Sequence, residues 1–121
     1  MLKVGIIGVG TVGASVANIL RDNKNIITAR AGIEIVPTIG VVSNLHKTRN
    51  VDIKLSDNID DVLNDDSIDV VVELMGGIDK PNEIVRKALL KGKAVVTANK
   101  ALLAYHRYEL QELAGDIPFE F

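Results

Sequence analysis

The chain has 121 residues, of which 47% are hydrophobic and 25% charged, with a formal net charge of −2 and no cysteine. This length accommodates one domain with its own core, while the charge balance and an aromatic content of 3% argue against a nucleic-acid or anionic-membrane surface. The lack of cysteine excludes disulfides, thiolate metal sites and a thiol nucleophile, and we assign no metal site.

The first half of the chain predicts two strands. Val4–Ile7 form a short apolar run typical of a strand that is buried on both faces. A helix is predicted to follow through about Arg21, from apolar residues at helical spacing, namely Val12, Val16, Ile19 and Leu20. Residues 23–32 are ambiguous and could form a short helix ended by Gly32. Residues 33–42 predict the second strand, although Pro37 and Gly40 weaken it.

In the second half, strands and helices continue to alternate. Residues 43–54 are polar and predict a loop, followed by a short helix over 59–63 capped by Ser56 or Asp57. Residues 68–75 form the clearest buried strand. The next helix opens with Asp79 as its cap and Pro81 in its first turn, and Gly92 ends it. The last predicted elements are a strand over 94–97, a helix over about 100–113 and a strand that begins at 118.

This alternation predicts the fold class. Strands alternating with helices indicate an α/β protein of the Rossmann type, doubly wound, with a mainly parallel sheet and helices on both faces. We expect residues 1–121 to form a single dinucleotide-binding domain. Because the chain stops within an apolar strand at Phe121, we also expect it to be the truncated front part of a longer enzyme, without its catalytic and dimerisation domain. No signal peptide or bilayer-length apolar run is present, so we expect a cytoplasmic protein.

A glycine-rich turn follows the first strand and opens the first helix. Gly8 permits a tight turn, Gly10 lets the backbone approach a pyrophosphate, and Gly13 lets the helix pack closely on the strand. The backbone N–H groups at the helix N-terminus would then bind the phosphates, with the Thr11 hydroxyl as a further donor. The predicted cofactor-binding run is Gly8-Val9-Gly10-Thr11-Val12-Gly13. The alternative is a glycine-rich turn without a ligand.

The end of the second strand bears on cofactor preference. A carboxylate is expected there to hold the ribose 2′-hydroxyl of NAD, but this strand ends in Ser43 and Asn44, which we predict to contact the cofactor. Lys47 and Arg49 lie nearby, so the segment favours NADP over NAD. The equally weighted alternative is that both are solvated loop charges.

Two further strand ends are candidate parts of the site, because ligands bind beyond the carboxyl ends of parallel strands. Met75, Gly76 and Gly77 follow the third predicted strand and are expected beside the nicotinamide, or else form a simple turn. Asn99 is predicted to cap the last helix. Lys100 opposes the dipole of that helix, so local stability does not explain it and it could contact cofactor or substrate; taken alone, an ordinary surface lysine is the favoured alternative.

Three blocks, residues 7–13, 70–77 and 95–104, carry a family resemblance. In this order and spacing the chain resembles homoserine dehydrogenase, and the most specific block contains Thr97-Ala98-Asn99-Lys100-Ala101-Leu102-Leu103-Ala104. The resemblance implies interconversion of L-homoserine and L-aspartate 4-semialdehyde with NAD(P)(H), in threonine, methionine and isoleucine biosynthesis. It implies that Lys100 contacts the cofactor phosphate or the substrate at the cleft, and we predict Lys100 to be catalytic. It also implies that Val9, Thr11 and Val12 lie on the cofactor diphosphate and ribose and that Met75 and Gly76 lie near the nicotinamide.

The resemblance also implies a catalytic domain beyond this chain, through which the full-length protein would form a homodimer. We therefore expect residues 1–121 alone to bind NADP(H) weakly and to lack dehydrogenase activity. Two alternatives stay open: the cofactor domain of another amino-acid dehydrogenase, which would lack the block at residues 97–104, and a stand-alone nucleotide-binding, redox-sensing module.

Overall fold

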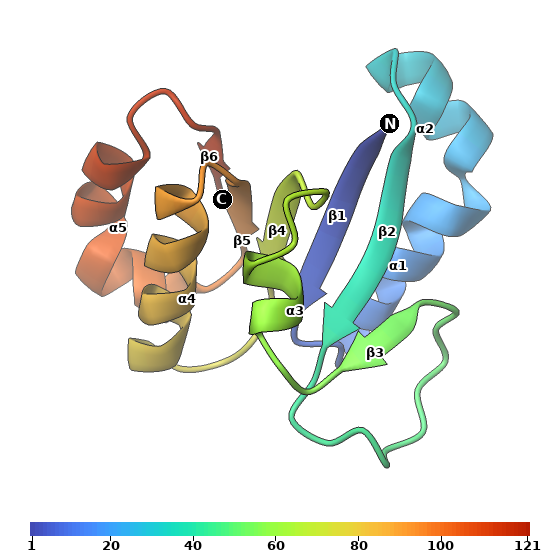
Figure 1. Cartoon of the computed structure of the whole chain (residues 1–121), viewed down its shortest axis with the longest axis horizontal. Helices are drawn as coiled ribbons and strands as arrows, with labels where there is room; N and C mark the ends of the chain where they lie inside the picture. The colour runs from blue at the N-terminus through green and yellow to red at the C-terminus, as the bar shows by residue number, and fades with distance from the viewer.

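The computed structural model describes all residues 1–121 and contains one six-stranded parallel sheet (Figure 1). The elements are β1 (Leu2–Ile7), α1 (Thr11–Asp22), α2 (Lys24–Ala31), β2 (Ile35–Val41), β3 (Lys54–Ser56), α3 (Asp60–Leu63), β4 (Val70–Glu73), α4 (Asp79–Leu90), β5 (Ala94–Thr97), α5 (Lys100–Ala114) and β6 (Phe119–Glu120). The spatial order is β3-β2-β1-β4-β5-β6 with every pair parallel, which confirms the doubly wound Rossmann arrangement. None of the helices has the length and apolar character required to cross a membrane.

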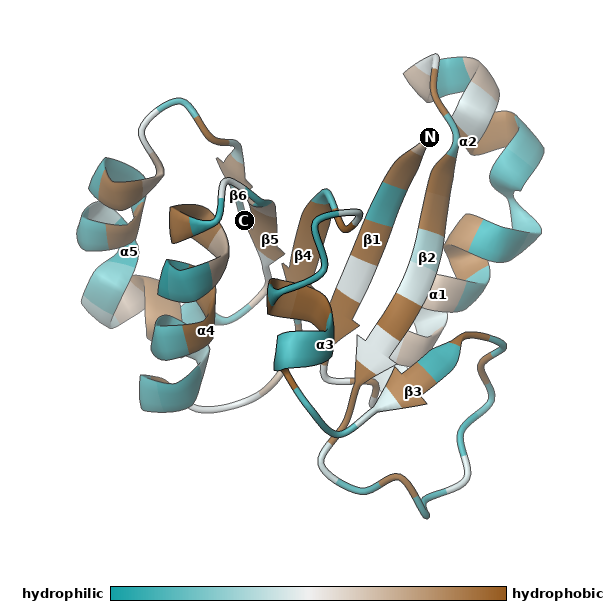
Figure 2. Cartoon of the chain, viewed as in Figure 1, coloured by the Kyte–Doolittle hydropathy of each residue, from teal (hydrophilic) through white to brown (hydrophobic).

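Hydrophobic residues, brown in Figure 2, recur along the strands and along the helices, and buried apolar clusters lie on both faces of the sheet. On the face carrying α3, α4 and α5, 15 buried residues form the larger core, with Val71 and Val95 contributed by the central strands. On the face carrying α1, 6 buried residues form a smaller core. Because the strands are buried from both sides, they read as near-continuous apolar runs, as expected for parallel sheets.

The face that α1 packs on the sheet differs from the prediction. Gly13 and Ala17 are its buried residues, whereas Val12 and Ile19 are 59% and 54% exposed. Small residues let the helix axis approach the strands closely, so Gly13 and Ala17 are the fully buried residues of α1, and Val16 is only partly buried against the smaller core. The predicted apolar face was therefore wrong for Val12 and Ile19.

Several local predictions are decided by the structure. The ambiguous segment forms α2 and ends at Gly32, whose φ of 75° is left-handed. The predicted loop over residues 43–54 ends in β3, a strand that was not predicted. β3 is only three residues long and carries the exposed Lys54, so its sequence has no clear apolar pattern. Neither Ser56 nor Asp57 caps α3; the Asn58 Oδ1 atom accepts from the Asp60 backbone N–H at 3.0 Å instead.

The predicted cap of α4 was also wrong. Asp79 is the first helical residue, Ile78 precedes it, and no side-chain capping bond is made. Asp79 nevertheless places a negative charge in the first turn, where the helix dipole favours it.

Candidate functional site

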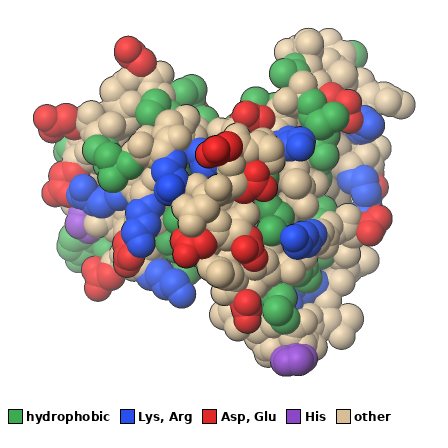
Figure 3. Space-filling model, viewed as in Figure 1, with side chains coloured by type: hydrophobic (Ala, Val, Ile, Leu, Met, Phe, Trp, Pro, Cys, Tyr) green, Lys and Arg blue, Asp and Glu red, His purple; other side chains and the backbone are tan.

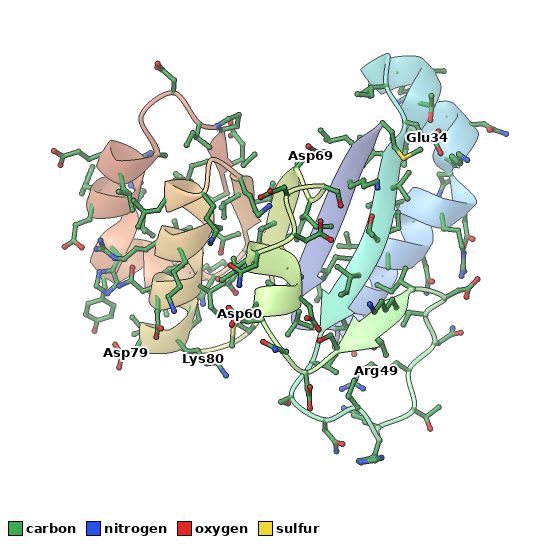
Figure 4. All side chains as sticks on the ribbon, in the orientation of Figure 1. Glu34, Arg49, Asp60, Asp69, Asp79 and Lys80 are labelled. Carbon is green, nitrogen blue, oxygen red and sulfur yellow. The ribbon has the colours of Figure 1, made fainter.

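A cleft of about 670 Å³ lies at the carboxyl edge of the sheet, next to the neighbouring strands β1 and β4, between which the strand order reverses. This is the topological switch point at which doubly wound sheets bind ligands. In Figure 3 the surface is notched at this edge, and Figure 4 shows Arg49 and Lys80 on either side of it. The lining residues are Ile7, Gly8, Val9, Gly10, Val41, Val42, Ser43, Asn44, Lys47, Arg49, Asp57, Asn58, Ile59, Leu74, Met75 and Lys80.

The glycine loop forms the floor of this cleft. Gly8 has a φ of +92°, and a Cβ there would lie 3.0 Å from the backbone at Leu74 and Met75. A Cβ on Gly13 would lie 2.3 Å from the Gly8 carbonyl oxygen. These two glycines are therefore required by the fold itself. A Cβ on Gly10 would meet nothing within 4 Å, so this position leaves open space above the loop.

The open space above Gly10 adjoins the N-terminus of α1. Gly10 is the N-cap and offers no side chain, and the first turn holds no acidic residue. The first backbone N–H of this helix to bond within the chain belongs to Ala14, which donates to the Gly10 carbonyl at 2.9 Å. Thr11, Val12 and Gly13 precede it, where a helix leaves its N–H groups unpaired. Unpaired donors, a positive dipole end and an unfilled glycine cradle together fit a diphosphate.

The segment that follows β2 borders one end of the cleft. Ser43 and Asn44 line it and are exposed. The Arg49 guanidinium bonds back to the chain: Nε donates to the Val9 carbonyl at 3.0 Å, and Nη1 donates to the carbonyls of Asn44 and Lys47 at 2.7 and 3.0 Å. Arg49 therefore ties this loop to the glycine loop and is not a freely solvated charge, one of the two alternatives left open by the sequence.

At the other end of the cleft, beyond β4, a buried carboxylate holds the neighbouring loop in place. Glu73, the last residue of β4, is fully buried. Its Oε1 accepts from the Thr97 hydroxyl at 2.9 Å, and its Oε2 accepts from the Met75 backbone N–H at 2.8 Å. Burial raises the pKa of the Glu73 carboxyl, while the hydrogen bonds from Thr97 and Met75 act in the opposite direction.

Asn99 joins the same network. It caps α5 as predicted, because its Oδ1 accepts from the Leu102 N–H at 3.0 Å. Its Nδ2 donates to the carbonyls of Met75 and Gly77 at 3.3 and 2.8 Å. The Asn99 side chain is thus fully engaged in holding two loops together.

Lys100 is exposed at the start of α5 and lines a second hollow of about 380 Å³. Val12, Leu74, Met75, Ala98 and Asn99 complete this hollow, so the exposed end of α1 faces the loops that follow β4 and β5. The predicted residues therefore lie along one edge of the sheet. Val9 differs from the others because its side chain is buried, which leaves only its backbone for a ligand.

Sequence reasoning missed Glu73 as part of the site. A signal was available, because a carboxylate inside the apolar run of β4 must find hydrogen-bond partners once it is buried. Which partners it finds depends on the register that places Glu73 beside Thr97.

Comparisons with known proteins agree with one another. A family model described as homoserine dehydrogenase, NAD binding domain, matches residues 8–117. The homoserine dehydrogenase of Helicobacter pylori is 45% identical over 120 residues, covering 99% of this chain and 28% of that protein. The Bacillus subtilis homoserine dehydrogenase is 36% identical over 126 residues, covering 98% and 29%. The chain therefore spans less than a third of the length of these relatives.

Solved structures give the same result. A crystal structure of Staphylococcus aureus homoserine dehydrogenase matches 99% of this chain and 32% of its own, with a TM-score of 0.92 and 36% identity. A homoserine dehydrogenase from Thiobacillus denitrificans matches 98% of this chain and 28% of its own, with a TM-score of 0.91 and 41% identity.

Proposed function

Because the chain belongs to the family of homoserine dehydrogenase NAD-binding domains, we propose that the protein carrying it interconverts L-homoserine and L-aspartate 4-semialdehyde. The observation that supports this most directly is the match of the family model across residues 8–117, which includes every residue that lines the cleft except Ile7. The reaction is a step in the biosynthesis of threonine, methionine and isoleucine. Such a role is consistent with a cytoplasmic protein acting on a small-molecule substrate.

The residues present fit a nicotinamide dinucleotide, which when bound supplies the hydride chemistry of the reaction. In our proposal, Gly8, Gly10 and Gly13 shape the diphosphate cradle, and the N–H groups of Thr11 and its neighbours bind the phosphates. The backbone of Val9 and the side chain of Val12 flank the cofactor. Met75, Gly76 and Gly77 lie against its nicotinamide half, and Asn99 holds their backbone in place.

We assign Lys100 to the reacting centre, in contact with the cofactor or the substrate. Its exposure beside Met75 supports this role, because an ammonium there is free to reach a ligand. The proton of the substrate hydroxyl is handled by residues outside this chain. The domain alone therefore orients the cofactor without turning over substrate, and the full-length protein assembles as a homodimer through its remaining part.

We propose NADP as the preferred cofactor. The segment that directly follows β2 carries Ser43, Asn44, Lys47 and Arg49 and no carboxylate, which is where an acid would accept the ribose 2′-hydroxyl; the one carboxylate that lines the cleft, Asp57, follows β3. Lys47 and Arg49 supply the positive charge that favours a 2′-phosphate there, and Nη2 is the Arg49 group left to donate to it, because Nε and Nη1 donate to backbone carbonyls.

A domain exchange tests the proposed activity. This chain would replace the corresponding domain of the S. aureus enzyme, and NADP-dependent oxidation of L-homoserine would be measured for the chimera and for the chain alone. We expect turnover by the chimera and none by the chain. The same chimera with Lys100→Met should keep its affinity for NADPH and lose about 100-fold in kcat, if a charge at the reacting centre is removed. A folded chimera that binds NADPH but leaves homoserine unoxidised contradicts the proposal.

A further inference from the structure

The two glycines that follow β4 give their loop little stiffness of its own. Gly77 adopts a φ of +93°, and a Cβ on Gly76 would meet nothing within 4 Å. Glycine has the greatest backbone freedom of any residue, so a defined conformation here requires contacts from elsewhere. Three hydrogen bonds provide them, one from the Met75 N–H to Glu73 and two from Asn99 to the carbonyls of Met75 and Gly77.

One of these hydrogen bonds ends on the Glu73 carboxylate, and Asn99, which makes the other two, is linked to the same carboxylate through Thr97. Both carboxylate oxygens are used, one by Met75 and one by Thr97. The Thr97 hydroxyl also accepts from the Asn99 backbone N–H at 3.1 Å, which connects the carboxylate to the residue that opens α5. Glu73 and Thr97 are paired across β4 and β5 in the sheet register, so the junction is fixed by two central strands.

Stability of the fold alone does not explain why residue 73 is a glutamate. The residues before it in β4 are Val70, Val71 and Val72, and an aliphatic side chain at position 73 would pack without the cost of burying a carboxyl group. What the carboxylate adds is two acceptors directed at the loops that follow β4 and β5.

We infer that Glu73 is a positioning residue for the nicotinamide half of the cofactor: it fixes the Met75–Gly77 backbone and, through Thr97 and Asn99, sets it relative to the start of α5. The inference rests on the proposed cofactor site. It assigns no contact between Glu73 and the ligand, and it leaves the adenosine half, on the other side of the glycine loop, independent of this carboxylate.

The test compares two ligands that differ only in the nicotinamide half. Binding of NADPH and of 2′-phospho-ADP-ribose to the 121-residue chain would be measured by calorimetry, and the NADPH measurement would be repeated by its fluorescence. We expect Glu73→Ala to weaken NADPH binding about tenfold and to leave 2′-phospho-ADP-ribose binding within about twofold, the scale of one lost hydrogen bond to a charged group. Glu73→Gln keeps an acceptor for Met75 and should recover most of the loss.

Two further variants keep the test decisive. Thr97→Val is nearly isosteric, removes only the hydroxyl, and should reproduce the selective NADPH defect even if Glu73→Ala fails to fold. Lys93→Met is the matched control, since Lys93 is a buried polar residue that donates to the carbonyls of Asp65 and Ile68 at 2.6 and 2.8 Å, at the opposite end of the strands. We expect it to lower stability without separating the two ligands.

The outcomes are distinguishable. Selective loss of NADPH binding in Glu73→Ala and Thr97→Val supports the inference. Equal loss of both ligands, or no loss of either, overturns it and leaves the cofactor site intact. If the unsubstituted chain binds neither these two ligands nor NADH and ADP-ribose, the proposed cofactor site itself is wrong, and the inference falls with it.

Discussion

The two ends of the cleft are held in place by different means. Beyond β2, an exposed loop is tied down by one long charged side chain, that of Arg49, whose donors reach carbonyls at Val9, Asn44 and Lys47. Beyond β4 and β5, the loops are held by a buried network in which Glu73 and Thr97 are both at most 1% exposed. The glycine loop between them is common to both.

This difference separates what each end contributes. Surface charges are screened by solvent and salt, so the Arg49 end can change its sequence and its ligand at little cost to the fold. A buried carboxylate with both oxygens engaged is coupled to the core, so changes at the Glu73 end affect folding and binding together. In the proposed binding mode, the end beyond β2 holds the adenosine half and is suited to selecting the cofactor, and the end beyond β4 and β5 holds the nicotinamide half in register.

The largest expected effect comes from the part that the two ends share. In Gly13→Ala the new Cβ would lie 2.3 Å from the Gly8 carbonyl, so α1 must move away from the loop. We expect the free energy of unfolding to fall by about 2 kcal/mol, as for other overpacked sites, and NADPH affinity to fall about 100-fold. Urea unfolding and calorimetry measure these quantities.

Gly10→Ala is the matched control for that experiment. Its Cβ meets no protein atom within 4 Å, so stability should stay within about 0.5 kcal/mol. Affinity should still fall, because the Cβ occupies the space assigned to the diphosphate. Unchanged stability and affinity in Gly13→Ala would show that α1 is not fixed by this contact.

An intermediate effect is expected at the adenosine end. Arg49→Ala removes three hydrogen bonds to backbone carbonyls and the proposed partner of the 2′-phosphate. We expect about a tenfold loss of NADPH affinity and a loss of NADH affinity of less than about threefold. Arg49→Lys should not restore the affinity for NADPH, because an ammonium group lacks the several fixed donors of a guanidinium. Arg30→Ala, an exposed arginine on α2, is the charge-matched control, and equal losses for both cofactors in Arg49→Ala would contradict a role in selection.

The smallest effect is a pH dependence at the nicotinamide end. Burial raises the folded-state pKa of Glu73 above its ordinary value of 4.5, so the protonated carboxyl favours the fold. The contribution of the protonated Glu73 carboxyl to the free energy of unfolding is fully present below pH 4.5. It is lost as the pH rises through the pKa of Glu73 in the folded state. Glu73→Gln cannot ionise, so its stability relative to the unsubstituted chain should rise with pH over this interval. Urea unfolding at several pH values measures this, and a difference that falls with pH would reverse the assignment.

The order of elements could be predicted from the sequence because parallel strands buried on both faces leave long apolar runs, as in β1 and β4. The glycine loop could be predicted equally well, because Gly8 and Gly13 are required by local backbone geometry. Other features depend on the assembled fold. β3 is defined by pairing with β2 rather than by its own composition, and α1 is buried through Gly13 and Ala17 because the close approach leaves no room for larger residues.

The candidate site, too, could be predicted only in part from the sequence. Asn99 could be identified as a cap from its place before an apolar helix, but its bonds to Met75 and Gly77 join residues 22 or more positions apart. Likewise, nothing local to Arg49 indicates that its guanidinium reaches the Val9 carbonyl, 40 positions away in the chain. Such contacts follow only from the sheet order that brings these strand ends to one edge.

The loop between β2 and β3 has a consequence for protein engineering. It leaves the sheet after Val42, whose N–H donates to the Ser56 carbonyl at 2.8 Å, so its two ends are clamped together. Residues 43–48 are exposed, and only Val51 and Ile53 near the far end pack against the smaller core. Residues 43–48 can therefore be exchanged as a unit, while Arg49 and Asn50, which bond to Val9 and Asn18, are kept. In the proposed binding mode, a graft that carries a carboxylate in place of Asn44 would shift the nucleotide preference without a redesign of the scaffold.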